Sequence, residues 1–119
     1  MAEVVELKKG KIFSLKDARG LLPVVKKITC EAVGEAEQLT RRMEESLPEP
    51  SHEAPYEKEL VEIVDRWSQK ILKLGCTPKG LWLVDFDNGE GYYCWHHPEE
   101  ELGFYHTYEG AFAGRTPIL

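Results

Sequence analysis

The chain has 119 residues, 42% of them hydrophobic and 30% charged, which is the composition of a single globular domain with its own core. Fifteen basic residues against 21 acidic ones leave a net charge of −6, so the chain lacks the basic face that a nucleic-acid or anionic-membrane binder needs. Three cysteines without a CxxC spacing argue against a disulfide framework, and no apolar run has the length of a signal or membrane-spanning segment, so a cytoplasmic protein is expected.

A long amphipathic helix is predicted over residues 14–45. Ser14 is a typical N-cap, Asp17 occupies the N3 position of a capping box, and Phe13 precedes the cap as a hydrophobic staple does. Apolar residues then recur every three or four positions. Pro23 interrupts this pattern. Because proline donates no backbone hydrogen bond, the helix is expected to kink or break near it.

A second helix is predicted over residues 55–74, after a loop at 46–55 that contains three prolines. Its apolar positions again follow helical spacing, and Gly75 is the expected glycine beyond the helix end. Two long helices joined by a short loop predict an antiparallel hairpin. The apolar edges left over must meet either the rest of the chain or a second copy, so a homodimer is expected, with a monomer as the rival.

From Gly80 the apolar period becomes two, and an antiparallel sheet of three strands, or four, is predicted over residues 80–108. Asn88-Gly89 is a strong signal for a two-residue hairpin turn. The tail at 109–119 is rich in glycine and alanine and is expected to be irregular. Residues 1–119 are therefore expected to form one α+β domain, a helical hairpin packed with a small antiparallel sheet.

A two-residue turn would pair Asp85 with Tyr92 and divide the side chains between two faces of the sheet. The expected core face carries Trp82, Val84, Phe86, Tyr93 and Trp95. The other face is mixed in character and carries Leu81, Leu83, Asp85, Tyr92, Cys94 and His96. Polar chemistry is therefore expected on the mixed face.

The face of His106 depends on the length of the turn before the third strand. A four-residue turn pairs His97 with Leu102 and places His106 on the aromatic face, opposite Tyr93. This register is preferred because it also buries Leu102 and Phe104, and it makes His106 a core histidine that bonds a Tyr hydroxyl or Glu109. A turn one residue longer or shorter reverses the strand and brings His106 onto the mixed face.

Two kinds of chemistry are open to the mixed face. Asp85, Cys94, His96 and His106 have the ligand types of a zinc or iron(II) site, although no metal-binding spacing is present. Cys94 with His96 or His106 would form a nucleophile–base pair only with the ring nitrogen about 3 Å from sulfur. Arg115, flanked by small residues, is expected to pair with Asp85, Glu101 or Glu109, or to hold an anionic ligand.

Several segments resemble the bacterial domain-of-unknown-function family 2203. The tail from Cys94-Trp95 through the run ELGFYH to AGRTP is similar to the family's CWxxGExEIGYWHxxxEGFxGRxP pattern. The opening FSLKDAR, followed by LLP, is similar to its F-T-x-x-E-A-x-x-L-L-P, and the segment around VDF to its G-L-V-D-F. The chain differs at Tyr105, Pro98 and Ala111. The resemblance spans residues 11–118 and implies no known activity.

The first functional hypothesis is a non-enzymatic, homodimeric module that binds an interaction partner, a small anionic ligand or a peptide, without cofactor. Its expected ligand-binding residues are Asp85, Trp95, Glu101, His106, Glu109 and Arg115. The alternative is a small metal-dependent hydrolase, with zinc or iron held by Asp85, Cys94, His96 and His106. Neither a nucleic acid nor a membrane is expected as a partner.

Overall fold

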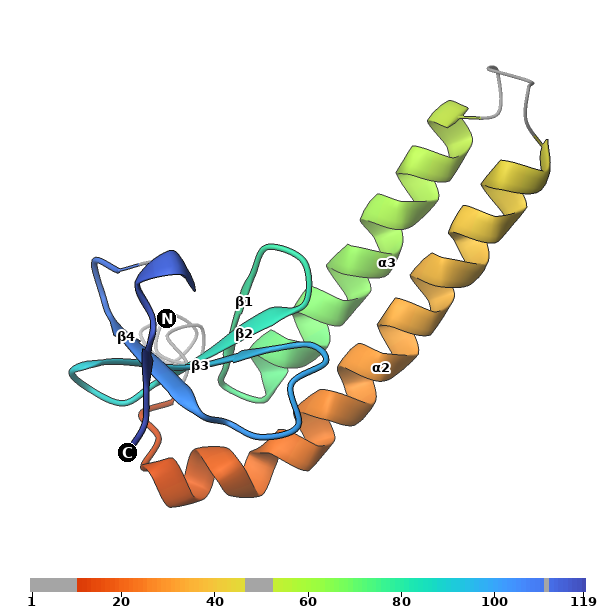
Figure 1. The fold of residues 1–119 in the computed structure, drawn as a ribbon. Helices are drawn as coiled ribbons and strands as arrows, with labels where there is room; N and C mark the ends of the chain where they lie inside the picture. The colour runs from red at the N-terminus through yellow and green to blue at the C-terminus, as the bar shows by residue number, and fades with distance from the viewer. Residues whose placement is uncertain (1–10, 47–52, 111) are drawn as a thin grey trace, which may run out of the picture.

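The computed structural model describes residues 11–46, 53–110 and 112–119, which form an α+β fold (Figure 1). A helical hairpin precedes a five-stranded antiparallel sheet. The elements are α2 (Leu15–Ser46), α3 (Glu53–Lys73), β1 (Thr77–Lys79), β2 (Leu83–Asp87), β3 (Gly91–His96), β4 (Phe104–Thr107), the 3-10 helix η2 (Phe112–Gly114) and β5 (Thr116–Pro117). Among these residues, no helix has an apolar stretch long enough to cross a bilayer.

Helix α2 begins and bends as its sequence predicts. The Ser14 hydroxyl accepts a hydrogen bond from the Asp17 amide at 3.0 Å, which satisfies one of the free amides of the first turn. Pro23 lies inside the helix, which continues through it. In Figure 1 the helix changes direction within its first third, so the proline kinks the helix without breaking it.

Helix α3 runs antiparallel to α2 and ends in a Schellman motif. Gly75 has a positive φ of 89°, which a residue without a Cβ adopts easily. The amide of Cys76 bonds the Ile71 carbonyl at 3.3 Å, and the amide of Gly75 bonds the Leu72 carbonyl at 2.9 Å. The helix begins at Glu53, two residues before the predicted start. Residues 47–52 of the expected loop lie outside the described residues.

The sheet has five strands in the order β1-β2-β3-β4-β5, not the three or four predicted. Both extra strands carry a proline, Pro78 in β1 and Pro117 in β5. Proline cannot donate to a ladder, so it is tolerated only at an edge, and these strands are the two edges. Part of the tail expected to be irregular is thus an edge strand.

The β2–β3 pairing differs from the predicted register by two residues. Asp85 lies opposite Cys94, not Tyr92, because four residues, not two, separate the last paired residues, Asp87 and Tyr92. The Asn88 side chain accepts hydrogen bonds from the amides of Glu90 and Gly91, which stabilises this wider turn. A shift of two leaves each side chain on its predicted face. Accordingly, Val84, Phe86 and Trp95 are fully buried in the core.

The preferred register of the third strand was wrong by one residue. In β4, His106 lies opposite Tyr92, and Tyr105 lies opposite Tyr93. The chain between β3 and β4 is longer than the expected four-residue turn, and Leu102 is buried before the strand begins. A change of one residue in the register turns every side chain of the strand to the opposite face of the sheet. His106 therefore lies on the mixed face with Asp85 and Cys94.

The core lies between the hairpin and one face of the sheet. Phe13 packs edge-on against Phe86, with ring centroids 5.5 Å apart. Deeper in the hairpin, the Trp67 indole donates to the Thr29 hydroxyl at 2.8 Å, so a buried N–H and a buried hydroxyl satisfy each other. The helices cover the aromatic face, which leaves the opposite face of the sheet to the C-terminal segment.

Candidate functional site

Three ligand-type side chains meet on the sheet face that points away from the helices. Asp85, Cys94 and His106 come from β2, β3 and β4, and their nearest ligand atoms all lie within 4.8 Å of one another. At most 6% of each residue is exposed. The antiparallel register brings them together, because Asp85 faces Cys94 directly and His106 occupies the neighbouring row. His96, expected in the same cluster, is not part of it; its ring contacts Phe112 instead.

Both ring nitrogens of His106 have partners, and neither is the Tyr hydroxyl or Glu109 expected from the sequence. Nδ1 lies 2.8 Å from the Thr107 carbonyl oxygen, and Nε2 lies 3.2 Å from Asp85 Oδ1. A carbonyl oxygen can only accept, so the Nδ1 atom carries the hydrogen. The Nε2 lone pair therefore points at the carboxylate in the neutral ring.

Two acceptors cannot face each other in a buried site without a shared proton or a cation. At 3.2 Å, Nε2 and Oδ1 must hold a proton between them, on one atom or the other, when no cation is bound. Burial raises the pKa of the Asp85 carboxyl, and the hydrogen bond and charge of His106 offset this rise only in part. The pair therefore needs a proton, or a cation, between its two atoms.

Cys94 is a protonated thiol in this environment. Burial raises its pKa to about 11, although the hydrogen bond from Arg115 acts in the opposite direction. Arg115 Nη1 lies 3.9 Å from Cys94 Sγ. A hydrogen bond with the thiol also lowers the pKa of Asp85, and here the thiol is the donor. Without a cation, a Cys94 thiolate nucleophile is disfavoured at neutral pH.

The partner of Arg115 is Glu99, not the expected Asp85, Glu101 or Glu109. Arg115 donates through Nη1 to Glu99 Oε1 at 3.2 Å and through Nη2 to Glu99 Oε2. Its guanidinium carbon also lies 3.8 Å from the ring centroid of Phe104 and 4.3 Å from that of Phe112. A bidentate ion pair between two rings is a strong arrangement for arginine. It leaves this guanidinium little capacity for a free anion.

The remaining expected ligand-binding residues lie elsewhere. Trp95 is fully buried on the helix-facing side of the sheet, and its indole donates to the Glu99 carbonyl at 2.8 Å. Glu101 and Glu109 are exposed. The structure therefore brings Asp85, His106 and Arg115 to one face, with Cys94 between them, and separates the other three.

A cavity of about 280 Å³ opens beside the three-residue cluster. Asp85 and His106 form part of its wall, whereas Cys94 lies behind them. The rest of the lining comes from β1 and the turn after it, from β2 and β3, and from the segment after β4, and it includes Lys79, Tyr92, Tyr108 and Phe112. A group placed between Asp85 and His106 would therefore be accessible from this cavity.

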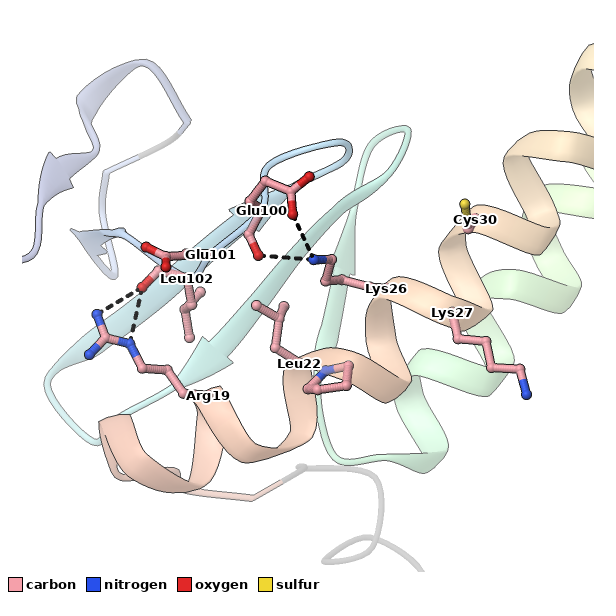
Figure 2. Close-up of a pocket in the computed structure, with 9 residues that line it drawn as sticks. Arg19, Leu22, Lys26, Lys27, Cys30, Glu100, Glu101 and Leu102 are labelled. Atoms are coloured by element: carbon pink, nitrogen blue, oxygen red, sulfur yellow. Dashed lines mark hydrogen bonds and ion pairs between the residues drawn. The ribbon is translucent and has the colours of Figure 1, made fainter.

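A larger hollow of about 790 Å³ lies along the N-terminal part of α2, away from this cluster (Figure 2). Two of its charged groups are already engaged: Arg19 donates to the Leu102 carbonyl at 3.1 Å, and Lys26 to the Glu100 carbonyl at 3.0 Å. Glu101 and the exposed Cys30 also line it. This surface has volume but no converging polar groups, so we place the candidate site at the smaller cavity.

Oxygen, sulfur and nitrogen donors in this arrangement match a divalent metal of the zinc or iron(II) type. Ligands of one tetrahedral ion lie roughly 3.3–3.8 Å apart, given the usual bond lengths. The 3.2 Å between Asp85 and His106 is close to that, and Cys94 would need a shift of about 1 Å. The Thr107 carbonyl orients the His106 ring as the outer partner of a metal-bound histidine does.

Sequence reasoning missed several residues around the cavity. Lys79 was missed because the predicted sheet began at residue 80, so β1 was not expected. Glu99 is one of three consecutive glutamates, and Glu101 was expected to pair with Arg115 instead. Its signal is local: the Glu99 carboxylate accepts from the His96 amide at 2.9 Å across a turn. Such a short-range acceptor is readable only once the turn is known.

Comparisons with known proteins give one result. A family model described as an uncharacterized conserved protein, DUF2203, matches residues 11–118. No curated protein and no solved structure matches the chain. The matched range contains the cluster, the cavity and the Arg115–Glu99 pair.

Proposed function

We propose that this chain, which belongs to the DUF2203 family, is a small metal-dependent hydrolase that binds zinc or iron(II) through Asp85, Cys94 and His106. The family description names no activity, so the geometry of the site supports the proposal. The observation that carries the proposal is the convergence of three buried donors of different chemistry on one point beside a cavity. A structural zinc site has four protein ligands, whereas three protein ligands leave a position for water or substrate.

Charge supports a divalent ion at this point. Asp85 and a deprotonated Cys94 carry two negative charges, and the His106 ring is neutral with its hydrogen on Nδ1. Two buried anions side by side are costly unless a cation of matching charge compensates them. A divalent metal ion is that cation, and the Arg115 guanidinium, 3.9 Å from the sulfur, stabilises the thiolate form of Cys94.

The reaction class follows from the open position. A metal ion held by three protein donors activates water or polarises a carbonyl in substrates that reach it. Asp85 and His106 both line the cavity, so such a substrate would approach from there. The first hypothesis from the sequence, a non-enzymatic anion-binding module centred on Arg115, has less support because Glu99 already pairs with that guanidinium.

Metal analysis of the purified protein tests the proposal. After treatment with a chelator and reloading, we expect one zinc or cobalt(II) ion per chain, with a thiolate-to-cobalt charge-transfer band in the cobalt form. Because Cys94 must lose its proton to bind, the apparent affinity should rise with pH. Hydrolysis of p-nitrophenyl acetate should be lost on chelation and restored by metal.

Matched variants identify the ligands. Asp85→Asn and Cys94→Ser are both close in shape to the wild type. Loss of a residue that only hydrogen-bonds a metal ligand weakens metal binding by roughly 10- to 100-fold, so loss of a ligand itself should weaken it by more. His96→Ala and Cys30→Ser are the controls, because neither residue belongs to the cluster. A protein that takes up no metal, or variants that bind as the wild type does, would refute the proposal.

A further inference from the structure

The walls of the cavity beside the proposed metal site are aromatic. The Tyr92 and Tyr108 rings meet edge to face, with centroids 5.2 Å apart, and Tyr92 also lies against His106 at 5.4 Å. Phe112 lines the cavity from the C-terminal segment and is 43% exposed. Rings with exposed area at the edge of a cavity suit a flat, apolar group.

One cation lines the same cavity. Lys79 on β1 is exposed, its Nζ lies 5.9 Å from the Tyr92 ring centroid, and its charge acts on Asp85. The Tyr108 hydroxyl donates to Asp87 Oδ1 at 2.7 Å, and this hydrogen bond raises its pKa to about 12, so this ring stays neutral. Arg115 is already paired with Glu99. Lys79 is thus the cavity-lining group that can meet an anion.

Charge and volume together limit what fits. With Asp85, Cys94 and a divalent ion in balance, the single positive charge of Lys79 matches one negative charge and not two. A phosphate dianion would leave a second negative charge unbalanced beside the buried Asp85 carboxylate. A volume of about 280 Å³ lies just below the range of cavities for drug-sized ligands, so the ligand must be small.

We propose that this cavity binds a small carboxylate with a flat apolar body. The carboxylate lies between Lys79 and the proposed metal position, and the body contacts the rings of Tyr92, Tyr108 and Phe112. This inference rests on the proposed metal site, and it names the chemical class of the substrate or product at that site.

Binding of benzoate to the metal-loaded protein tests the inference. Calorimetry, or the cobalt(II) spectrum, should show saturable binding of benzoate. Benzyl alcohol keeps the ring but lacks the charge, and acetate keeps the charge but lacks the ring. Each should bind at least about tenfold more weakly than benzoate. Phenyl phosphate at a pH where it is a dianion should also bind more weakly.

Variants separate the two parts of the ligand. Lys79→Gln should weaken benzoate binding about tenfold and leave benzyl alcohol unchanged, because only the charged head loses its partner. Phe112→Ala should weaken both ligands. Lys27→Gln, on the exposed face of α2, is the control and should change neither.

The outcomes distinguish this inference from the proposed function. Suppose the protein binds metal but binds benzyl alcohol or phenyl phosphate as tightly as benzoate, or Lys79→Gln leaves benzoate binding unchanged. Either result overturns the proposal of a carboxylate ligand and leaves the proposed metal site intact. A protein that takes up no metal, measured first on the same sample, overturns both.

Discussion

Arg115 shows how one side chain joins distant parts of the chain at the residue scale. It holds Glu99 of the β3–β4 connection in a bidentate pair, stacks on rings from β4 and η2, and reaches the Cys94 sulfur. The sequence predicted that Arg115 would either pair with a carboxylate or hold an anionic ligand, since small neighbours let it approach the sheet, and the structure shows an ion pair. It did not predict the partner, because Glu99, Glu100 and Glu101 differ only in how the connecting turn places them.

The Arg115–Glu99 pair predicts a pH-dependent contribution to stability. Burial raises the pKa of the Glu99 carboxyl, but hydrogen bonds from Arg115 and the His96 amide outweigh it, so the pKa lies below its ordinary 4.5. A lowered folded-state pKa stabilises the fold at pH values above the unfolded value, and this contribution is lost as pH falls through the folded value. Glu99→Gln should therefore lower the free energy of unfolding by about 1–3 kcal/mol near neutral pH.

Urea denaturation of the two metal-free proteins measures this difference. It should be constant near neutral pH and shrink when the pH is lowered below 4.5, where the wild-type carboxylate gains its proton. Glu100→Gln, which changes an exposed glutamate in the same turn, is the matched control. Equal stability of wild type and Glu99→Gln at pH 7 would contradict the prediction.

At the scale of the elements, periodicity predicted more than turns did. The two helices, the antiparallel hairpin and the aromatic core face of the sheet all follow from spacing along the chain. The pairing of β3 with β4 does not, because a single residue in the connection decides which face His106 occupies. The edge strands were missed since prolines argue against a strand unless its outer side is free, as it is in β1 and β5.

Gly91 is the position where β3 depends on the absence of a side chain. A Cβ there would lie 2.5 Å from the carbonyl oxygen of His106, and a backbone atom cannot move aside cheaply. Gly91→Ala should therefore destabilise the protein by about 1–3 kcal/mol and disturb the His106 backbone. Gly34→Ala in α2 is the control. A Cβ there meets nothing within 4 Å, so this change should stabilise by about 0.5–1 kcal/mol.

Chemical denaturation of both variants, with metal binding measured in parallel, checks this pair. Gly91→Ala should also lower metal affinity, whereas Gly34→Ala should leave it unchanged. A Gly91→Ala protein as stable as the wild type would show that the two strands do not approach each other as closely as the structure indicates.

The whole molecule is elongated because the distal part of the hairpin extends beyond the sheet (Figure 1). The radius of gyration of 16.4 Å exceeds the roughly 13.5 Å expected for a compact chain of this length. In this part of the hairpin each helix packs its apolar stripe against the other helix, and none of the residues that the structure describes forms a third layer over them. Sequence reasoning anticipated this problem of leftover apolar area but could not assign it to a part of the chain.

The homodimer expected from the sequence stays a prediction. Val61 and Leu72, 66% and 43% exposed, lie eleven residues apart and so on one side of α3. If this side contacts a second copy, light scattering should give twice the 13.6 kDa of the chain, and a Val61→Lys, Leu72→Lys double variant should give a single chain mass. Lys70→Glu, which lies half a turn around α3 from Val61 and is exposed, is a charge-changing control. A wild-type mass of 13.6 kDa at high concentration would exclude the dimer.

The distance between the distal hairpin and the donor-bearing face of the sheet has a practical consequence. Alterations at well-separated positions without shared neighbours usually have additive effects. The far ends of α2 and α3 therefore offer an attachment point for a fluorophore or a tethering peptide that leaves the proposed site undisturbed. A molecule immobilised there would present its cavity to solution, which suits surface-based screening of candidate acids.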